Sequence, residues 1–200
     1  MHACERAAAL GLFVAASPVL AASALAVWRL SGRSPWIAHR RVGQSGEVLW
    51  MFKLRTMWGS EKSSGVSGEG WIEYIRDDEG AETKRADDPR VAHWIAGFCR
   101  RHSIDELPQL WHVIRGEMAL IGPRPMTASE IRRHYGADAG EVLGVKPGMA
   151  GLWQVSGRNR LTYRERRELD LLFVRTRSLG MYARICLRIL PEVCGGSNSW

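Results

Sequence analysis

The sequence predicts an α+β fold dominated by helices, with one small β-hairpin and an apolar helix at the amino terminus. Three observations support this class: an uncharged run at 7–28, a β-prone stretch at 36–57 with a glycine-containing turn, and helix-capping patterns through much of the remaining chain. A length of 200 residues suits a single domain. We therefore divide the chain into an apolar segment, 1–30, and one folded domain, 31–200.

The apolar segment matches the ~20 residues that cross the hydrocarbon core of a bilayer. Ser17-Pro18 lies near its middle, where a proline removes one backbone hydrogen bond and costs roughly 3 kcal/mol. The Ser17 hydroxyl is placed to bind the carbonyl that is left over. A single span and a helix that enters and leaves the membrane on one side both agree with this pattern. A cleaved signal peptide agrees less well, because arginines are concentrated after the segment.

Turn and capping signals define the other elements. The turn 42–46 joins two strands into a hairpin, and Asp88-Pro89 predicts the start of a helix. A second helix around 110–114 ends at Gly116, and capping boxes begin at Thr127 and Thr162. The residues expected on the buried stripe of the helix after Asp88-Pro89 are Val91, Trp94, Ile95 and Phe98.

The segment 181–190 mixes apolar residues with arginines four apart. This pattern suits a helix lying in a membrane interface, where arginines reach toward lipid phosphate. It suits an ordinary amphipathic core helix equally well, and the residues alone leave the two interpretations open.

The strongest candidate for chemistry is the segment 103–110, which holds the adjacent carboxylates of Asp105 and Glu106. Arginines come just before it, and an aspartate in a basic setting stays ionised and can attack phosphorus through an acyl-phosphate intermediate. Ser103 and Glu106 also match a capping box, in which Glu106 caps a helix and Asp105 favours its dipole. Both interpretations remain open at this stage.

Two further motifs contain groups that suit a phosphate or a nucleotide. In 121–125, two prolines stiffen the backbone around Arg124, whose planar guanidinium matches a phosphate; the alternative is a structural turn. In 146–159, glycines allow close backbone approach, while Gln154 and Arg158 offer hydrogen-bonding groups. Neither motif matches the P-loop or the dinucleotide fingerprint.

Taken in order, these segments resemble the monotopic phosphoglycosyl transferases, bacterial sugar transferases of the polyprenyl-phosphate type. The resemblance covers nearly the whole chain, and the joint order of its motifs is far more specific than any one of them. The matching residues are Ser17-Pro18, Arg41-Val42-Gly43, 52–57, 88–91, 100–118, 121–125, 145–159 and 168–170.

The resemblance implies a ping-pong reaction at the cytoplasmic face of the bacterial inner membrane. The Asp105 position would attack the β-phosphate of a UDP-sugar, release UMP and hold the phosphosugar until polyprenyl (undecaprenyl) phosphate takes it. The Glu106 position would assist as a base or an orienting group. Mg²⁺, bound partly by Asp105, would neutralise phosphate charge. Such a reaction begins the assembly of a bacterial glycoconjugate or exopolysaccharide.

The resemblance also implies the membrane topology and further site positions. The segment 1–30 would be a re-entrant membrane helix broken at Ser17-Pro18. The catalytic domain, 31–200, would pack on membrane lipids through interfacial amphipathic helices. The positions expected to bind substrate phosphate are Arg100, Arg124 and Lys53, and those for the nucleotide sugar are Gln154, Arg158 and Asp170.

Three other classes of protein compete with this interpretation. The net charge of +7 suits a nucleic-acid-binding protein, but that class leaves the uncharged run unexplained, so we expect no nucleic-acid partner. A glycosidase needs two carboxylates about 5 Å or more apart across a sugar, which adjacent residues do not readily offer. A membrane scaffold without catalysis would tolerate Asp105→Asn.

Overall fold

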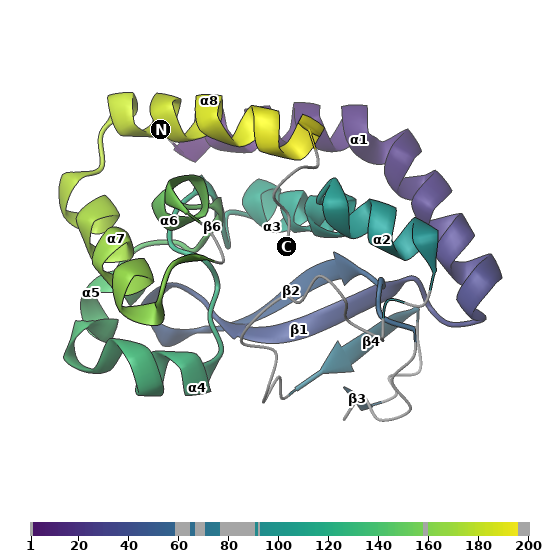
Figure 1. Ribbon diagram of the computed structural model, residues 1–200, viewed down its shortest axis with the longest axis horizontal. Helices are drawn as coiled ribbons and strands as arrows, with labels where there is room; N and C mark the ends of the chain where they lie inside the picture. Colours follow the sequence, from purple (N-terminus) through teal and green to yellow (C-terminus); the bar gives the residue numbers. More distant parts are fainter. Residues whose placement is uncertain are drawn as a thin grey trace.

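The computed structural model describes residues 2–58, 65–66, 71–76, 91, 93–157 and 160–195. Helices gather over one side of a four-stranded sheet, and a pair of short parallel strands lies near the carboxyl-terminal helices (Figure 1). This arrangement confirms the predicted helix-dominated α+β class.

The four-stranded sheet has the order β2-β1-β4-β3. Strands β1 (Trp36–Val42) and β2 (Val48–Leu54) are antiparallel and form the predicted hairpin around the turn η1 (Gln44–Gly46). Strand β4 (Ile72–Ile75) runs parallel to β1, and β3 (Gly65–Val66) pairs antiparallel with β4. Strand β2 therefore lies at one edge of the sheet, where one side of its backbone is left for other partners.

Helix α1 extends from His2 to Ser31 and includes Pro18. Pro18 has no N–H to give to the carbonyl of Val14, four residues earlier. The Ser17 hydroxyl donates to that carbonyl at 2.8 Å, so the predicted compensation at Ser17-Pro18 is confirmed. Figure 1 shows the axis of α1 changing direction along its length. Among the described helices, α1 alone is long and apolar enough to cross a membrane.

Helix α1 contributes to two hydrophobic clusters through small and β-branched side chains. Near its start, Ala9 is buried with Leu49 of β2 and Val113. Near its end, Val27 is buried with Leu54 of β2. Helix α1 also contacts the 3₁₀ segment η2 (Ile104–Gln109), as does β2. The segment η2 is thus held by the membrane-length helix and by the edge strand.

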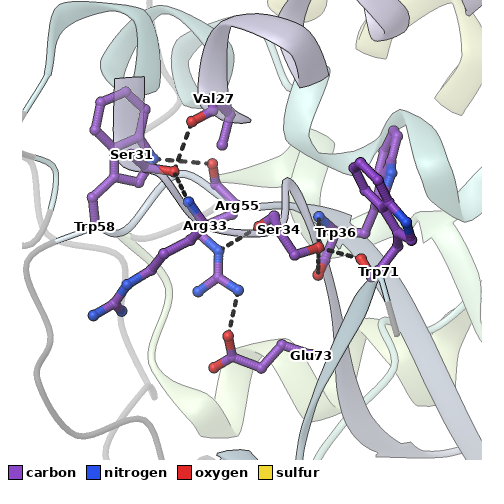
Figure 2. Close-up of polar contacts among 9 residues, drawn as sticks. All are labelled: Val27, Ser31, Arg33, Ser34, Trp36, Arg55, Trp58, Trp71 and Glu73. Carbon is purple, nitrogen blue, oxygen red and sulfur yellow. Dashed lines mark hydrogen bonds and ion pairs between the residues drawn. The ribbon is translucent and has the colours of Figure 1, made fainter. Parts of the chain in front are cut away.

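A buried arginine joins the end of α1 to the sheet (Figure 2). The Nε of Arg55 donates to the carbonyl of Ser34 at 2.7 Å, and its Nη2 pairs with the carboxylate of Glu73 on β4. The Ser34 hydroxyl in turn donates to the carbonyl of Trp71. These bonds satisfy the Ser34 carbonyl between α1 and β1 and the Trp71 carbonyl just before β4, and so link the starts of the two strands.

Helix α2 (Trp94–Arg101) differs from its prediction in the face that it buries. Asp88-Pro89 lies outside the described residues, but the helix start predicted there was wrong, because Val91 lies before the helix. His93 caps α2 by accepting a hydrogen bond from the Ile95 N–H. Trp94 is 74% exposed and Phe98 49% exposed, so their placement on a buried stripe was wrong. The buried residues are Ala96, Cys99 and Arg100. The small Ala96 and Cys99 side chains allow close helix packing, and Cys99 lies in the same cluster as Val27 of α1.

The end of α3 and the starts of α4 and α7 lie where the capping signals predict. Gly116 ends α3 with a left-handed φ of 82°, and complete capping boxes open α4 at Thr127 and α7 at Thr162. The bounds are α3 Leu110–Arg115, β5 Ala119–Ile121, α4 Ala128–Glu130, the π-helical turn η3 Ile131–Tyr135, η4 Gly136–Asp138, α5 Ala139–Leu143, β6 Gly148–Ala150, α6 Leu152–Ser156, α7 Tyr163–Thr176 and α8 Leu179–Gly195.

Helix α8 has a core face and an exposed face. Ile185 is fully buried beside Phe173 of α7, while Arg184, Leu187 and Arg188 are exposed. Figure 1 shows α8 passing in front of the first half of α1. One face of α8 therefore packs in the core, as the core-helix interpretation of 181–190 predicts. Placement of the other face in a membrane interface stays a prediction.

Candidate active site

Asp105 and Glu106 lie in η2, between α2 and α3. Ser103, just before η2, adopts a left-handed conformation with φ 55°, and its side chain makes no capping hydrogen bond. The capping-box interpretation of Ser103 and Glu106 is therefore wrong. The Ser103 carbonyl instead accepts the Glu106 N–H at 3.1 Å, so the backbone starts the 3₁₀ turn.

The structure brings Lys53 of β2 to Glu106. The Lys53 Nζ lies 3.5 Å from the Glu106 Oε1, and both side chains are largely buried. Asp105, the residue before Glu106, is only 4% exposed. Burying a charged carboxylate costs free energy unless nearby groups stabilise the charge, so the burial of Asp105 requires such groups in its surroundings. The structure thus brings Lys53 of β2 to Glu106 of η2, and we call these two residues, together with the adjacent Asp105, the carboxylate cluster.

Arg100 is buried in the last turn of α2, which packs on η2. Its guanidinium therefore belongs to the same region of the fold as the carboxylate cluster. Arg124 lies in the loop after β5 and is half-buried. The backbone around it is held on both sides: the Pro123 carbonyl accepts the Gly148 N–H at 2.7 Å, and the Met126 carbonyl accepts the Val42 N–H at 2.8 Å. The rigid backbone expected around Arg124 is present.

The glycines of the 146–159 motif serve close backbone packing, as predicted. Strands β5 and β6 run parallel, and a Cβ on Gly148 would lie 2.0 Å from the backbone nitrogen of Gly122. Gln154 of α6 donates to the Met149 carbonyl at 3.4 Å. Arg158 lies outside the described residues. The described part of this motif therefore supports the loop that carries Arg124.

Asp170 of α7 lies in a different cluster. The Tyr135 hydroxyl donates to its Oδ2 at 2.7 Å, and Arg166 is also nearby. Burial raises the pKa of Asp170 to about 7, against the opposing effects of the Tyr135 hydrogen bond and the Arg166 charge. The described contacts of α7 are with α5, α6 and η3 rather than with η2. The structure thus places Asp170 with Tyr135 and Arg166, on a helix whose main packing contacts do not include η2.

This raised pKa predicts a pH-dependent stability. The folded protein binds the proton more tightly than the unfolded chain, whose aspartate titrates near 3.8. Asp170 therefore stabilises the fold at low pH, and its contribution decreases by about 1.4 kcal/mol per pH unit until the pH passes about 7. We expect Asp170→Asn to gain stability relative to the wild type between pH 5 and pH 8. Thermal unfolding across this range would measure the gain, and parallel pH curves for the two proteins would contradict it.

His112 is a buried residue whose role no local sequence pattern predicts. Its Nε2 accepts the backbone N–H of Phe52 at 3.1 Å, and its Nδ1 lies 2.6 Å from the Glu117 Oε2. The five-residue separation of His112 and Glu117 is not a helical contact spacing, so no sequence pattern signalled the pair. The contact matters because Phe52 directly precedes Lys53.

The order of the motifs along the chain is that of a known protein family. Residues 2–196 match the bacterial sugar transferase family, and the chain belongs to this family. The chain is 42% identical over 154 residues to the UDP-galactose-lipid carrier transferase of Erwinia amylovora, covering 74% of this chain and 31% of that protein.

Two other relatives match more of this chain. It is 36% identical over 177 residues to the exopolysaccharide production protein ExoY of Sinorhizobium fredii, covering 84% of this chain and 74% of ExoY. It is 33% identical over 192 residues to the UDP-glucose:undecaprenyl-phosphate glucose-1-phosphate transferase of Caulobacter vibrioides, covering 92% and 66%. The chain thus spans less than a third of the Erwinia protein and about three quarters of ExoY.

Proposed function

We propose that this protein transfers a hexose 1-phosphate from a UDP-hexose to polyprenyl (undecaprenyl) phosphate and releases UMP. The observation that carries the proposal is the buried Asp105 beside the Lys53–Glu106 ion pair, in a chain of the bacterial sugar transferase family. Relatives named for UDP-galactose and UDP-glucose support a hexose donor. The product would begin a glycoconjugate or exopolysaccharide, in keeping with the name of ExoY.

In the proposed reaction, a carboxylate oxygen of Asp105 attacks the β-phosphorus of the UDP-hexose. The bond from that phosphorus to the oxygen bridging the two phosphates breaks, and UMP leaves with the electron pair. An oxygen of polyprenyl phosphate then attacks the same phosphorus. The acyl-phosphate bond breaks, Asp105 is regenerated as a carboxylate, and a polyprenyl-diphosphate sugar is released.

The neighbouring charges suit this chemistry. Glu106 would orient the acceptor or take up a proton, and its pairing with Lys53 limits the positions that its carboxylate can adopt. Lys53, Arg100 and Arg124 would bind the phosphates, which are anionic in both half-reactions. Gln154 and Arg158 remain our candidates for contacts with the nucleotide sugar.

The site suits Mg²⁺. No group of three or more His, Cys, Asp or Glu side chains with metal-site geometry occurs in the described part of the chain. Mg²⁺ is commonly held by one or two carboxylates together with substrate phosphates, and Asp105 offers such a carboxylate. When bound, the ion would neutralise diphosphate charge and so make nucleophilic attack easier. The residues present therefore fit a metal held jointly with the substrate.

The proposed location is the cytoplasmic face of the bacterial inner membrane, with α1 as a re-entrant helix. Cys4 at the start of α1 and Cys186 on α8 are both exposed thiols and allow a topology test. In single-cysteine variants, we expect neither thiol to react with a membrane-impermeant maleimide in intact spheroplasts, and both to react after lysis. Labelling of Cys4 alone in intact spheroplasts would show that α1 spans the membrane and would rule out re-entry.

The activity is tested by UMP release from purified protein in nanodiscs. The reaction contains Mg²⁺, undecaprenyl phosphate and one UDP-sugar from a panel that includes galactose, glucose and N-acetylhexosamines. We expect release with a UDP-hexose, loss of release with a chelator, and appearance of the sugar in the lipid fraction. UMP release only with a UDP-N-acetylhexosamine would contradict the assignment of an unmodified hexose such as galactose or glucose. Failure of every donor would contradict the proposed function.

A further inference from the structure

The edge strand β2 and the segment η2–α3 are joined by two contacts from consecutive residues of β2. The Phe52 N–H donates to the ring of His112 on α3, and Lys53 pairs with Glu106 in η2. Helix α3 begins at the residue after η2 ends, so both contacts act on one continuous segment. The carboxylate cluster therefore lies immediately beside the His112 contact.

The His112 contact is the more rigid of the two. It joins a backbone N–H of the sheet to an imidazole that is almost fully buried. The ring also packs on the Phe52 ring, with the centroids 4.7 Å apart. By contrast, the Lys53–Glu106 pair joins two long side chains with many rotamers, which by themselves hold a distance poorly.

Hydrogen bonding defines the tautomer of His112. A backbone N–H can only donate, so Nε2 must be the acceptor and the ring proton lies on Nδ1. The Nδ1–H then donates to the Glu117 carboxylate, which the Arg115 guanidinium contacts at 2.8 Å. The acceptor nitrogen is thus kept facing β2 by a chain of contacts that begins at the protein surface.

We propose that His112 is a positioning residue that holds β2 in register with η2 and so sets Lys53 against Glu106 beside Asp105. This inference rests on the proposed transfer reaction. The physical reason is that catalytic groups need a supporting layer of packed and hydrogen-bonded residues to stay within about 0.5 Å of their productive positions. Without the Phe52 contact, the position of Lys53 relative to Glu106 would depend on the side-chain packing of β2 against η2 and on the flexible ion pair.

Two substitutions at His112 separate this role from general packing. His112→Phe keeps a planar ring and removes the acceptor, and we expect kcat for UMP release to decrease by about tenfold to a hundredfold. The KM for the UDP-hexose should stay within about a factor of three, because His112 is buried and its two ring nitrogens are already engaged by Phe52 and Glu117. His112→Gln supplies an oxygen acceptor for the Phe52 N–H and should recover most of the lost kcat.

The control is His134→Phe, which removes another imidazole from a turn outside the carboxylate cluster. It should leave kcat unchanged. Hydrogen exchange of the peptide 48–54 gives a readout that does not need catalysis: exchange should be faster in His112→Phe than in the wild type and slow again in His112→Gln.

The proposal would be overturned by a folded His112→Phe protein with wild-type kcat and exchange. A His112→Gln protein that matches His112→Phe in both measurements would overturn it as well. Wild-type protein that releases no UMP would contradict the proposed function instead, and the exchange measurement would still decide whether His112 holds β2.

Discussion

Asp105→Asn is expected to reduce UMP release by on the order of 10⁴-fold or more, because the substitution removes the proposed nucleophile. Asparagine has nearly the same shape as aspartate, so the buried site in η2 should keep its packing. The measurement is the initial rate of UMP release with the preferred UDP-hexose. Without polyprenyl phosphate, wild-type protein should in addition retain labelled sugar phosphate, and Asp105→Asn protein should retain none.

Asp138→Asn is the matched control, since Asp138 lies in η4 and pairs with Arg167 of α7, outside the carboxylate cluster. It should retain wild-type UMP release and labelling. Asp105→Asn protein that releases UMP as fast as the wild type would exclude the aspartyl intermediate.

Glu106→Gln should slow the reaction less than Asp105→Asn and should still allow sugar phosphate to be trapped on the protein, which distinguishes the assisting group from the nucleophile.

Gly148→Ala is expected to cause the largest loss of stability among single substitutions in the β5–β6 region. A Cβ at Gly148 would lie 2.0 Å from the backbone nitrogen of Gly122 and 2.5 Å from its Cα. Backbone atoms cannot move away as a flexible side chain can, so the two strands must separate. We expect the free energy of unfolding to decrease by more than ~4 kcal/mol, measured by urea or thermal unfolding in nanodiscs.

The same substitution should lower activity even where the protein remains folded. The Gly148 N–H donates to the carbonyl of Pro123, the residue before Arg124, so separation of the strands would displace that loop. Gly97→Ala is the control, because a Cβ at Gly97 in α2 meets nothing within 4 Å. Alanine is favoured over glycine in a helix by roughly 0.5–1 kcal/mol, so the control should be neutral or more stable. Equal unfolding of Gly148→Ala and the wild type would contradict the close approach of β5 and β6.

Local signals in the sequence predicted much of the fold. The capping boxes at Thr127 and Thr162, the helix end at Gly116 and the hairpin turn all appear where the residues indicate. Each depends on hydrogen bonds or dihedral angles within a few residues, so a short stretch of sequence contains the necessary information. The compensation of Pro18 by the Ser17 hydroxyl is predictable for the same reason.

Predictions that depended on distant contacts were less successful. The stripe of Trp94 and Phe98 was expected to be buried, but α2 buries its small residues because they allow close packing on α1. Ser103 matches a capping box yet adopts a left-handed backbone that the pattern cannot reveal. Asp170 and Asp105 were both site candidates, and their separation depends on how α7 packs.

The sequence by itself determined the adjacent carboxylates, the membrane-length helix, the helix ends at Gly116, Thr127 and Thr162, and the order of motifs that marks the family, because these are properties of residue type and spacing. The tertiary structure alone decided that Lys53 meets Glu106 and that His112 joins β2 to α3, since these contacts bring together residues 53 and 60 positions apart. Such contacts depend on the packing of α1, β2 and η2 as a unit, which no local pattern specifies.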